Sequence, residues 1–215
     1  MTHITALHIS DLHFNSSEVK DIGIVRKALF DDLQRLCEDG LRPNMVFFTG
    51  DMIASGDTGY GGGHGEYELA ATEFVDPLLQ TLDLSHDDFY FCSGNHDVQR
   101  SLIDEYTEDG LNTRLVDRTA VNKFIDEYEK NPARFTGVLA RMTNFIRFRD
   151  AMTNRHLQRC SPFVSTYKLQ VGMHNVGIAC FNSAWRAFGG KGDYGELLIG
   201  ERIVDSAIGD LEACE

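Results

Sequence analysis

Three short apolar segments, each followed directly by polar residues, constrain the fold of this 215-residue chain most strongly. The segments have the length and composition of buried strands: residues 3–10, 45–49 and 89–92. A polar cluster ends each one: Asp-Leu-His at 11–13, Gly-Asp at 50–51 and Gly-Asn-His-Asp at 94–97. Apolar residues at helical spacing lie between the segments, at 22–36 and 69–82. This alternation predicts an α/β fold with a parallel sheet.

The three polar clusters are expected to meet, because ligand sites in open α/β sheets lie outside the carboxyl ends of the strands. Carboxylate, imidazole and amide oxygen are ligands that suit divalent ions such as Mn²⁺, Fe or Zn²⁺. One carboxylate can bridge two such ions about 3.5–4 Å apart, as in hydrolytic two-metal sites. The residues alone therefore predict a metal site with hydrolytic chemistry.

The middle of the chain, at about 101–160, is predicted to be almost wholly helical and to form an insertion within one domain over residues 1–215. Residues 131–160 hold six arginines and one acid, Asp150. Two interpretations remain open: a packing subdomain with solvated arginines, or a lid that admits an anion. Arg149 falls inside an apolar helical stripe, so it is expected to meet a carboxylate or a phosphate.

The remainder of the chain returns to strand patterns at 163–171 and 176–182, with a turn between them and a last helix at about 201–211. Two glycine-rich loops are expected, at 55–65 and 189–195.

Composition narrows the function classes. Lys plus Arg is 20 and Asp plus Glu is 33, so the formal charge is 20 − 33 = −13, which argues against a protein that coats nucleic acid. A local basic groove for nucleic acid is not excluded.

No apolar run reaches the roughly 18 residues of a membrane helix, and no secretory signal is seen. Five cysteines without a CxxC pair indicate reduced, mostly buried thiols and a cytoplasmic location.

The three clusters together resemble the motifs of the calcineurin-like metallophosphoesterases, whose pattern is D-x-H, then G-D, then G-N-H-(D/E). The resemblance is most specific over residues 4–100. It implies a two-sheet β sandwich flanked by helices, with a dinuclear metal site. It also implies that Asp11 and His13 bind the first metal, Asp51 bridges, Asn95 binds the second metal and His96 assists the leaving group.

The chain departs from the family pattern after residue 100. The family supplies further metal-binding histidines from a G-H and a G-H-x-H motif, both after the G-N-H-(D/E) segment, and neither occurs after His96 in this sequence. The only histidines after His96 are His156 and His174. The expectation is a domain that lacks its C-terminal strands, binds one ion or none, and either self-associates or continues past Glu215.

Other residues are assigned by position. Asp97 is expected to orient the loop or a ligand histidine, and Arg100 to meet a phosphate or form a salt bridge. His8 is expected in the core or behind the ligands, and His64 on an exposed loop, from which it is the first candidate for a further ligand.

The function predicted from the sequence is metal-dependent hydrolysis of a phosphomonoester or phosphodiester, a nucleotide being one candidate substrate. The alternative is a metal-poor module without catalysis, or the N-terminal part of a larger regulatory protein.

Overall fold

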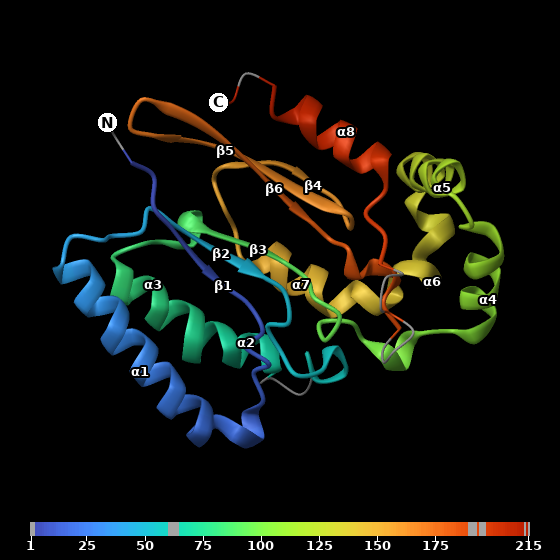
Figure 1. The fold of residues 1–215 in the computed structure, drawn as a ribbon. Coiled ribbons are helices and arrows are strands. Elements are labelled where there is room, and N and C mark those ends of the chain that lie inside the picture. The colour runs from blue at the N-terminus through green and yellow to red at the C-terminus, as the bar shows by residue number, and fades with distance from the viewer. Residues whose placement is uncertain (1–2, 60–64, 189–192, 194–196, 213, 215) are drawn as a thin grey trace.

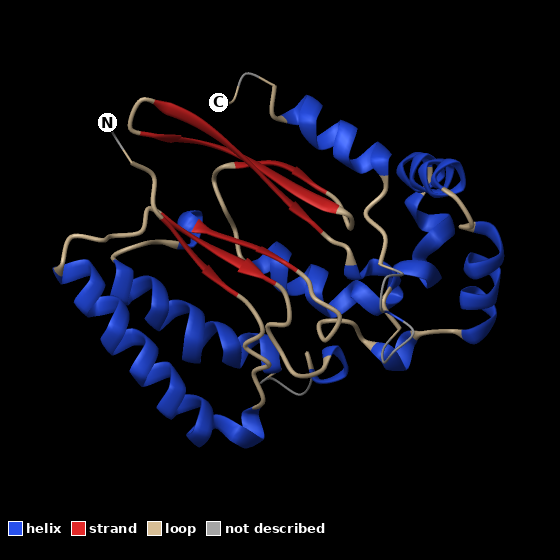
Figure 2. Cartoon of the chain, in the orientation of Figure 1, coloured by secondary structure: helices blue, strands red, loops and turns tan. Residues whose placement is uncertain are grey.

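Two three-stranded sheets packed against each other form the centre of the protein in the computed structural model (Figure 1, Figure 2). The structure describes residues 3–59, 65–188, 193, 197–212 and 214. The first sheet is parallel and has the order β1 (Ala6–Ile9), β2 (Met45–Thr49), β3 (Phe89–Cys92). The second sheet is antiparallel and has the order β4 (Leu157–Cys160), β5 (Val164–Val171), β6 (His174–Phe181). The predicted fold class, a sandwich of two sheets flanked by helices, is confirmed.

Helices cover both outer faces of the sandwich. In Figure 1, α1 (Val19–Glu38), α2 (Glu66–Ala70) and α3 (Asp76–Leu82) lie below the parallel sheet, and α8 (Glu201–Asp210) lies above the antiparallel sheet. The remaining helices lie between β3 and β4 in the sequence. They are α4 (Glu105–Arg114), α5 (Arg118–Lys130), α6 (Thr136–Leu139) and α7 (Thr143–Ala151). None of the helices in the described part of the chain has both the length and the apolar character needed to cross a bilayer.

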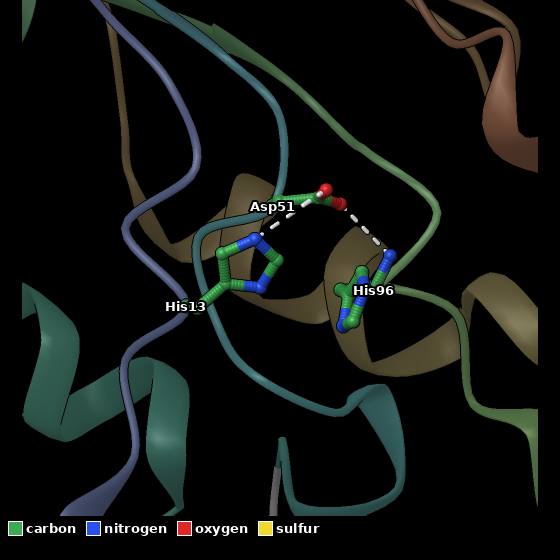
Figure 3. Close-up of side chains that lie close together, drawn as sticks. All are labelled: His13, Asp51 and His96. Carbon is green, nitrogen blue, oxygen red and sulfur yellow. Dashed lines mark hydrogen bonds and ion pairs between the residues drawn. The ribbon is translucent and has the colours of Figure 1, made fainter. Parts of the chain in front are cut away.

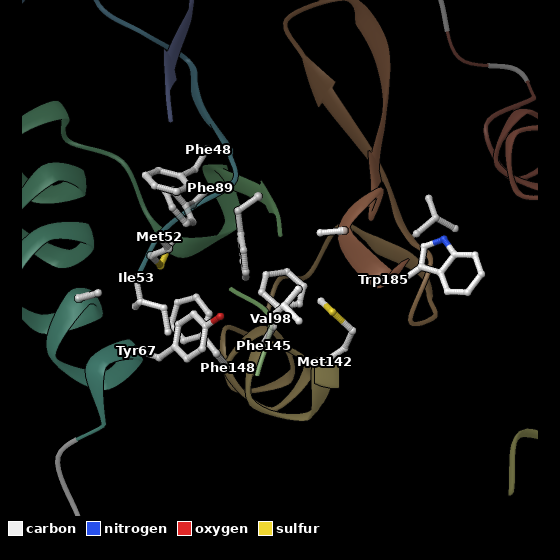
Figure 4. Close-up of a cluster of buried hydrophobic side chains, with 14 of the residues drawn as sticks. Phe48, Met52, Ile53, Tyr67, Phe89, Val98, Met142, Phe145, Phe148 and Trp185 are labelled. Carbon is white, nitrogen blue, oxygen red and sulfur yellow. The ribbon is translucent and has the colours of Figure 1, made fainter. Parts of the chain in front are cut away.

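The alternation of side chains along β2 explains why the parallel sheet has two buried faces. Val46 and Phe48 belong to the large core on the helix side, which Figure 4 shows together with Phe145 and Phe148 of α7. Met45 packs instead in a smaller core between the sheets. There, the rings of Tyr90 on β3 and Tyr167 on β5 meet edge to face, with centroids 5.0 Å apart. Each buried side chain of this size contributes about 1.5–3 kcal/mol.

Three secondary-structure expectations need correction. Residues 157–160 form strand β4 rather than helix. Its side chains are mostly exposed, so its sequence lacks the alternation of apolar and polar residues that is typical of a strand. Backbone pairing with β5 holds it in place. The helix predicted over 69–82 begins earlier, at Glu66, and contains a π-helical segment at Ala71–Val75. The helix whose apolar stripe was predicted to contain Arg149 is broken, before α7, into short 3-10 and α segments from Pro132 to Met142.

Two expectations about burial are also wrong. Among the five cysteines, all of them free, Cys37 is buried, Cys160 is exposed and the others are half-buried. His8 is exposed on β1, an edge strand that pairs only with β2 among the described strands. The Nε2 atom of His8 lies 2.7 Å from the Oγ1 atom of Thr49, on that neighbouring strand.

Candidate metal centre

The loops after β1, β2 and β3 meet at one edge of the parallel sheet. Backbone hydrogen bonds continue the β1–β2 pairing beyond the strands: the N–H of Asp11 donates to Gly50 O at 3.1 Å, and the N–H of His13 donates to Asp51 O at 2.9 Å. The loop after β3 joins the same edge, since the N–H of His96 donates to Oδ1 of Asp51 at 2.8 Å. Three polar clusters that are far apart in the sequence are thereby in contact.

Three of the loop residues have a left-handed backbone. The φ angles are 58° at Asp11, 46° at His13 and 57° at Asp51. Residues other than glycine seldom adopt this conformation, although Asp and His tolerate it better than most, and each instance costs about 1–3 kcal/mol. Strain of this kind clusters at functional sites, where the surrounding structure enforces it. Here the enforcing contacts are the hydrogen bonds between the loops.

The side chains of His13, Asp51 and His96 point toward one another at this edge (Figure 3). One ligand atom from each lies within 4.8 Å of the other two. The Nε2 atom of His13 is 3.9 Å from Oδ2 of Asp51, and the two imidazole rings are nearly perpendicular with centroids 4.4 Å apart. Asp11 extends the group, with its Oδ1 atom 3.7 Å from Nε2 of His13.

The orientation of the His96 ring is set by a backbone carbonyl. Its Nδ1 atom lies 2.9 Å from Ala54 O. A carbonyl only accepts hydrogen bonds, so Nδ1 carries a proton and Nε2 of the neutral ring has a free lone pair. A carbonyl behind a histidine in this way fixes its tautomer and the orientation of its ring. His96 is therefore suited either to bind a metal through Nε2 or to transfer a proton there.

Asp97 holds the two loops together from behind. Its side chain is fully buried, and its Oδ2 atom accepts hydrogen bonds from the N–H groups of Asp51 at 2.9 Å and Gly94 at 2.8 Å. The hydroxyl of Tyr67 donates to Oδ1 at 3.0 Å. Burial raises the pKa of this carboxyl to about 6, and the nearby Asp51 adds to the rise, while the hydrogen bonds oppose it. These contacts tie Asp97 to the loop that carries Asp51 and to the loop that carries His96.

Glycines permit the close approach of the loops. A Cβ atom at Gly94 would lie 2.1 Å from Oδ1 of Asp51. A Cβ atom at Gly50, where φ is +109°, would lie 2.9 Å from the backbone of Gly94. A Cβ atom at Gly56 would lie 2.3 Å from the carbonyl carbon of Val98. Side chains at these positions would displace the residues that surround the cluster.

The helices after β3 also brace the site. The buried Asn144 on α7 donates from Nδ2 to Gly56 O at 2.9 Å, and the N–H of Gly56 donates to His96 O at 2.8 Å. Neither Asn144 nor Tyr67 was singled out from the sequence. Nothing in the local sequence marked either residue, because Asn144 falls outside the apolar stripe that carries Phe145 and Ile146.

The other predicted site residues are placed as follows. Asn95 lies half-buried in the loop between Gly94 and His96, and its side chain has no hydrogen bond within the described ranges. Arg100 is exposed and has no ion pair with a described residue. Arg149 binds Asp150, with 2.8 Å between Nη2 and Oδ1, and the carbonyl of Ser161, rather than a residue of the cluster. His64 lies outside the described residues.

The donor set fits a divalent metal. One carboxylate and two imidazoles are borderline ligands of the kind that Mn²⁺, Fe and Zn²⁺ accept, and three protein ligands can hold a catalytic ion while leaving positions open. The fold and the cluster together define an α/β sandwich with a candidate metal centre at the carboxyl ends of its parallel strands.

Comparison with known families agrees with this class. The family model of the calcineurin-like phosphoesterases matches residues 4–156, more than half of the chain and all three polar clusters. The chain belongs to the calcineurin-like phosphoesterase family. No curated protein sequence and no solved structure is significantly similar to it.

Proposed function

We propose that the chain hydrolyses a phosphate ester with a divalent metal held by His13 and Asp51, with Asp11 beside them. The observation that carries the proposal is the convergence of His13, Asp51 and His96 within 4.8 Å at the loops that the family match covers. The metal, when bound, supplies a Lewis acid for a phosphoryl oxygen and lowers the pKa of water. Asn95 is proposed as a ligand of a second ion, on the family resemblance alone.

His96 is proposed to act on the leaving group. Its Nδ1–H bond to Ala54 O can persist while Nε2 holds a proton and delivers it to the departing oxygen. The backbone bond from His96 to Asp51 keeps this imidazole next to the carboxylate. General acids of this kind contribute about 10²–10⁴ in rate.

No nucleotide is proposed as the substrate, because three of the six arginines that suggested a polyanion are paired with acids of this chain. Arg149 pairs with Asp150, and the Nε atom of Arg159 lies 3.0 Å from Oδ2 of Asp210. Arg155 pairs with Asp87, with 3.1 Å between Nε and Oδ2. These contacts favour the packing interpretation of the helical region.

The direct test is hydrolysis of p-nitrophenyl phosphate and bis(p-nitrophenyl) phosphate with added Mn²⁺, and its loss on chelation. His96→Ala should lower turnover by about 10²–10⁴ and keep the metal. His86→Ala is the matched control, since His86 is exposed and the only partner of its imidazole among the described residues is Asp76. If His96→Ala loses the metal instead, His96 is a ligand.

A second candidate function is a metal-binding module without catalysis. It is supported by the ligand count for the second ion, which would have only Asp51 and Asn95, since neither a G-H nor a G-H-x-H motif occurs between His96 and residue 215. Saturable Mn²⁺ binding with no turnover of either ester would select this candidate.

A further inference from the structure

One cavity in the helical region lies apart from the residues of the metal centre. It has a volume of about 550 Å³ and lies between α4, α5 and the segment at 134–138. Its apolar lining includes Leu111 and Phe124, both buried, together with Phe135 and Val138. Small-molecule sites have volumes of about 300–1,000 Å³ and are lined mainly by apolar side chains. The cavity meets both criteria.

The rim of this cavity is positive, in contrast to the chain as a whole. Three cations line it, Arg114, Lys123 and Arg134, against one acid, Glu127. The local charge is 3 − 1 = +2, whereas the chain carries −13. An anion is therefore drawn to this rim more than to the surrounding surface.

The rim cations are held loosely. The Nζ atom of Lys123 is 3.9 Å from Glu127 and Nη1 of Arg134 is 3.8 Å from it, both beyond hydrogen-bond distance. Arg114 has no acidic partner within 4.0 Å among the residues that the structure describes. Arg134 also lies over the ring of Phe135, 5.3 Å from its centroid, which places the guanidinium above the apolar lining. These donors remain available to a ligand.

We propose that this cavity binds a small organic anion with an apolar body, such as a medium-chain acyl carboxylate. The body would lie on Leu111, Phe124 and Val138, and the carboxylate would meet Lys123 and Arg134. Such binding would require neither hydrolysis nor a bound metal.

The chain contains its own reporter for such binding. Its single tryptophan, Trp185, stacks on Phe124 with the ring planes 2° apart and the centroids separated by 5.4 Å. A ligand that contacts Phe124 is expected to change the fluorescence of Trp185.

The experiment is a titration of the full chain with octanoate, followed by tryptophan fluorescence and by calorimetry. Acetate carries the carboxylate but lacks the long alkyl chain, and 1-octanol carries the alkyl chain but lacks the charge. Octanoate should bind saturably, 1-octanol more weakly and acetate not measurably.

Variants connect the binding to the cavity. Lys123→Gln with Arg134→Gln should weaken octanoate binding by roughly fivefold or more, since one exposed ion pair is worth up to about fivefold. Val138→Phe should occupy part of the apolar lining and weaken octanoate binding in calorimetry. Lys27→Gln is the matched control: Lys27 and Lys123 are each 76% exposed and each pairs with an acid four residues later. It should leave the affinity unchanged.

Three results would overturn the proposal: no saturable octanoate binding by the wild type, equal affinity for 1-octanol and octanoate, or full affinity in the double variant. A thermal melt checks that each variant is folded. Because Lys123 and Arg134 are exposed, their replacement is expected to leave the melting temperature within a few degrees.

Discussion

The carboxylate of Asp97 accepts a hydrogen bond from the backbone N–H of Asp51, with 2.9 Å between Oδ2 and N. The same oxygen accepts from the N–H of Gly94. One fully buried carboxylate thus joins the loop that carries Asp51 to the loop that carries His96. The geometry of the candidate metal centre depends on this link, which also keeps the left-handed backbone of Asp51 in place.

Gly94→Ala is expected to disrupt the centre, because the new methyl group would lie 2.1 Å from Oδ1 of Asp51. Overpacking of this kind costs about 1–3 kcal/mol, and here it displaces a proposed ligand as well. Calorimetric Mn²⁺ titration should show a loss of affinity of at least tenfold. Gly209→Ala on α8 is the control, since a Cβ atom there has nothing within 4 Å and alanine favours the helix. Equal Mn²⁺ affinity in both variants would contradict the role of the Gly94 contact.

Asn144→Asp tests whether α7 braces the site. The substitution keeps the shape of the side chain but places an acceptor opposite Gly56 O, where Asn144 donates at 2.9 Å. Replacing a buried donor in this way lowers the free energy of unfolding by about 1–3 kcal/mol. Ester turnover should fall together with the free energy of unfolding, because Gly56 is hydrogen-bonded to His96. Thr143→Ala, at the exposed neighbouring position, should change neither quantity. Wild-type turnover in Asn144→Asp would show that the brace is dispensable.

Glu108→Gln tests the buried ion network between α4 and the segments around Arg141 and Arg186. Glu108 pairs with both arginines, and the distance to Nη1 of Arg186 is 2.6 Å. Burial and the neighbouring Arg186 lower the pKa of Arg141 to about 10. Removing the carboxylate from two buried cations should cost about 3–5 kcal/mol of the free energy of unfolding, measured with denaturant.

The matched control for this network is an exposed pair. Asp31→Asn removes the partner of Lys27, which is 76% exposed, and should cost less than about 1 kcal/mol. If Glu108→Gln costs no more than Asp31→Asn, the network does not stabilise the helical region.

The sequence predicts the parallel strands and the convergence of their polar ends. Both follow from the spacing of apolar residues and the alternation of strands with helices, which can be seen directly in the sequence. The positions of Asp51 and His96 at one sheet edge follow from them. The partners of the arginines could not be predicted, since Arg141 meets Glu108 and Arg159 meets Asp210 through tertiary packing alone. Strand β4 was missed because an exposed edge strand carries no apolar alternation.

The measurement that tests the central claim most directly is Mn²⁺ binding by the wild type, Asp51→Asn and Asp83→Asn. Asp83 is the matched control because its φ of 58° equals that of Asp51 within a degree, while it ends α3 away from the cluster. Asparagine tolerates the left-handed backbone as aspartate does, so only the charge and its metal contacts change. The account predicts saturable binding by the wild type and Asp83→Asn, and at least a tenfold loss in Asp51→Asn. Equal affinity in all three proteins, or no binding by the wild type, would contradict it.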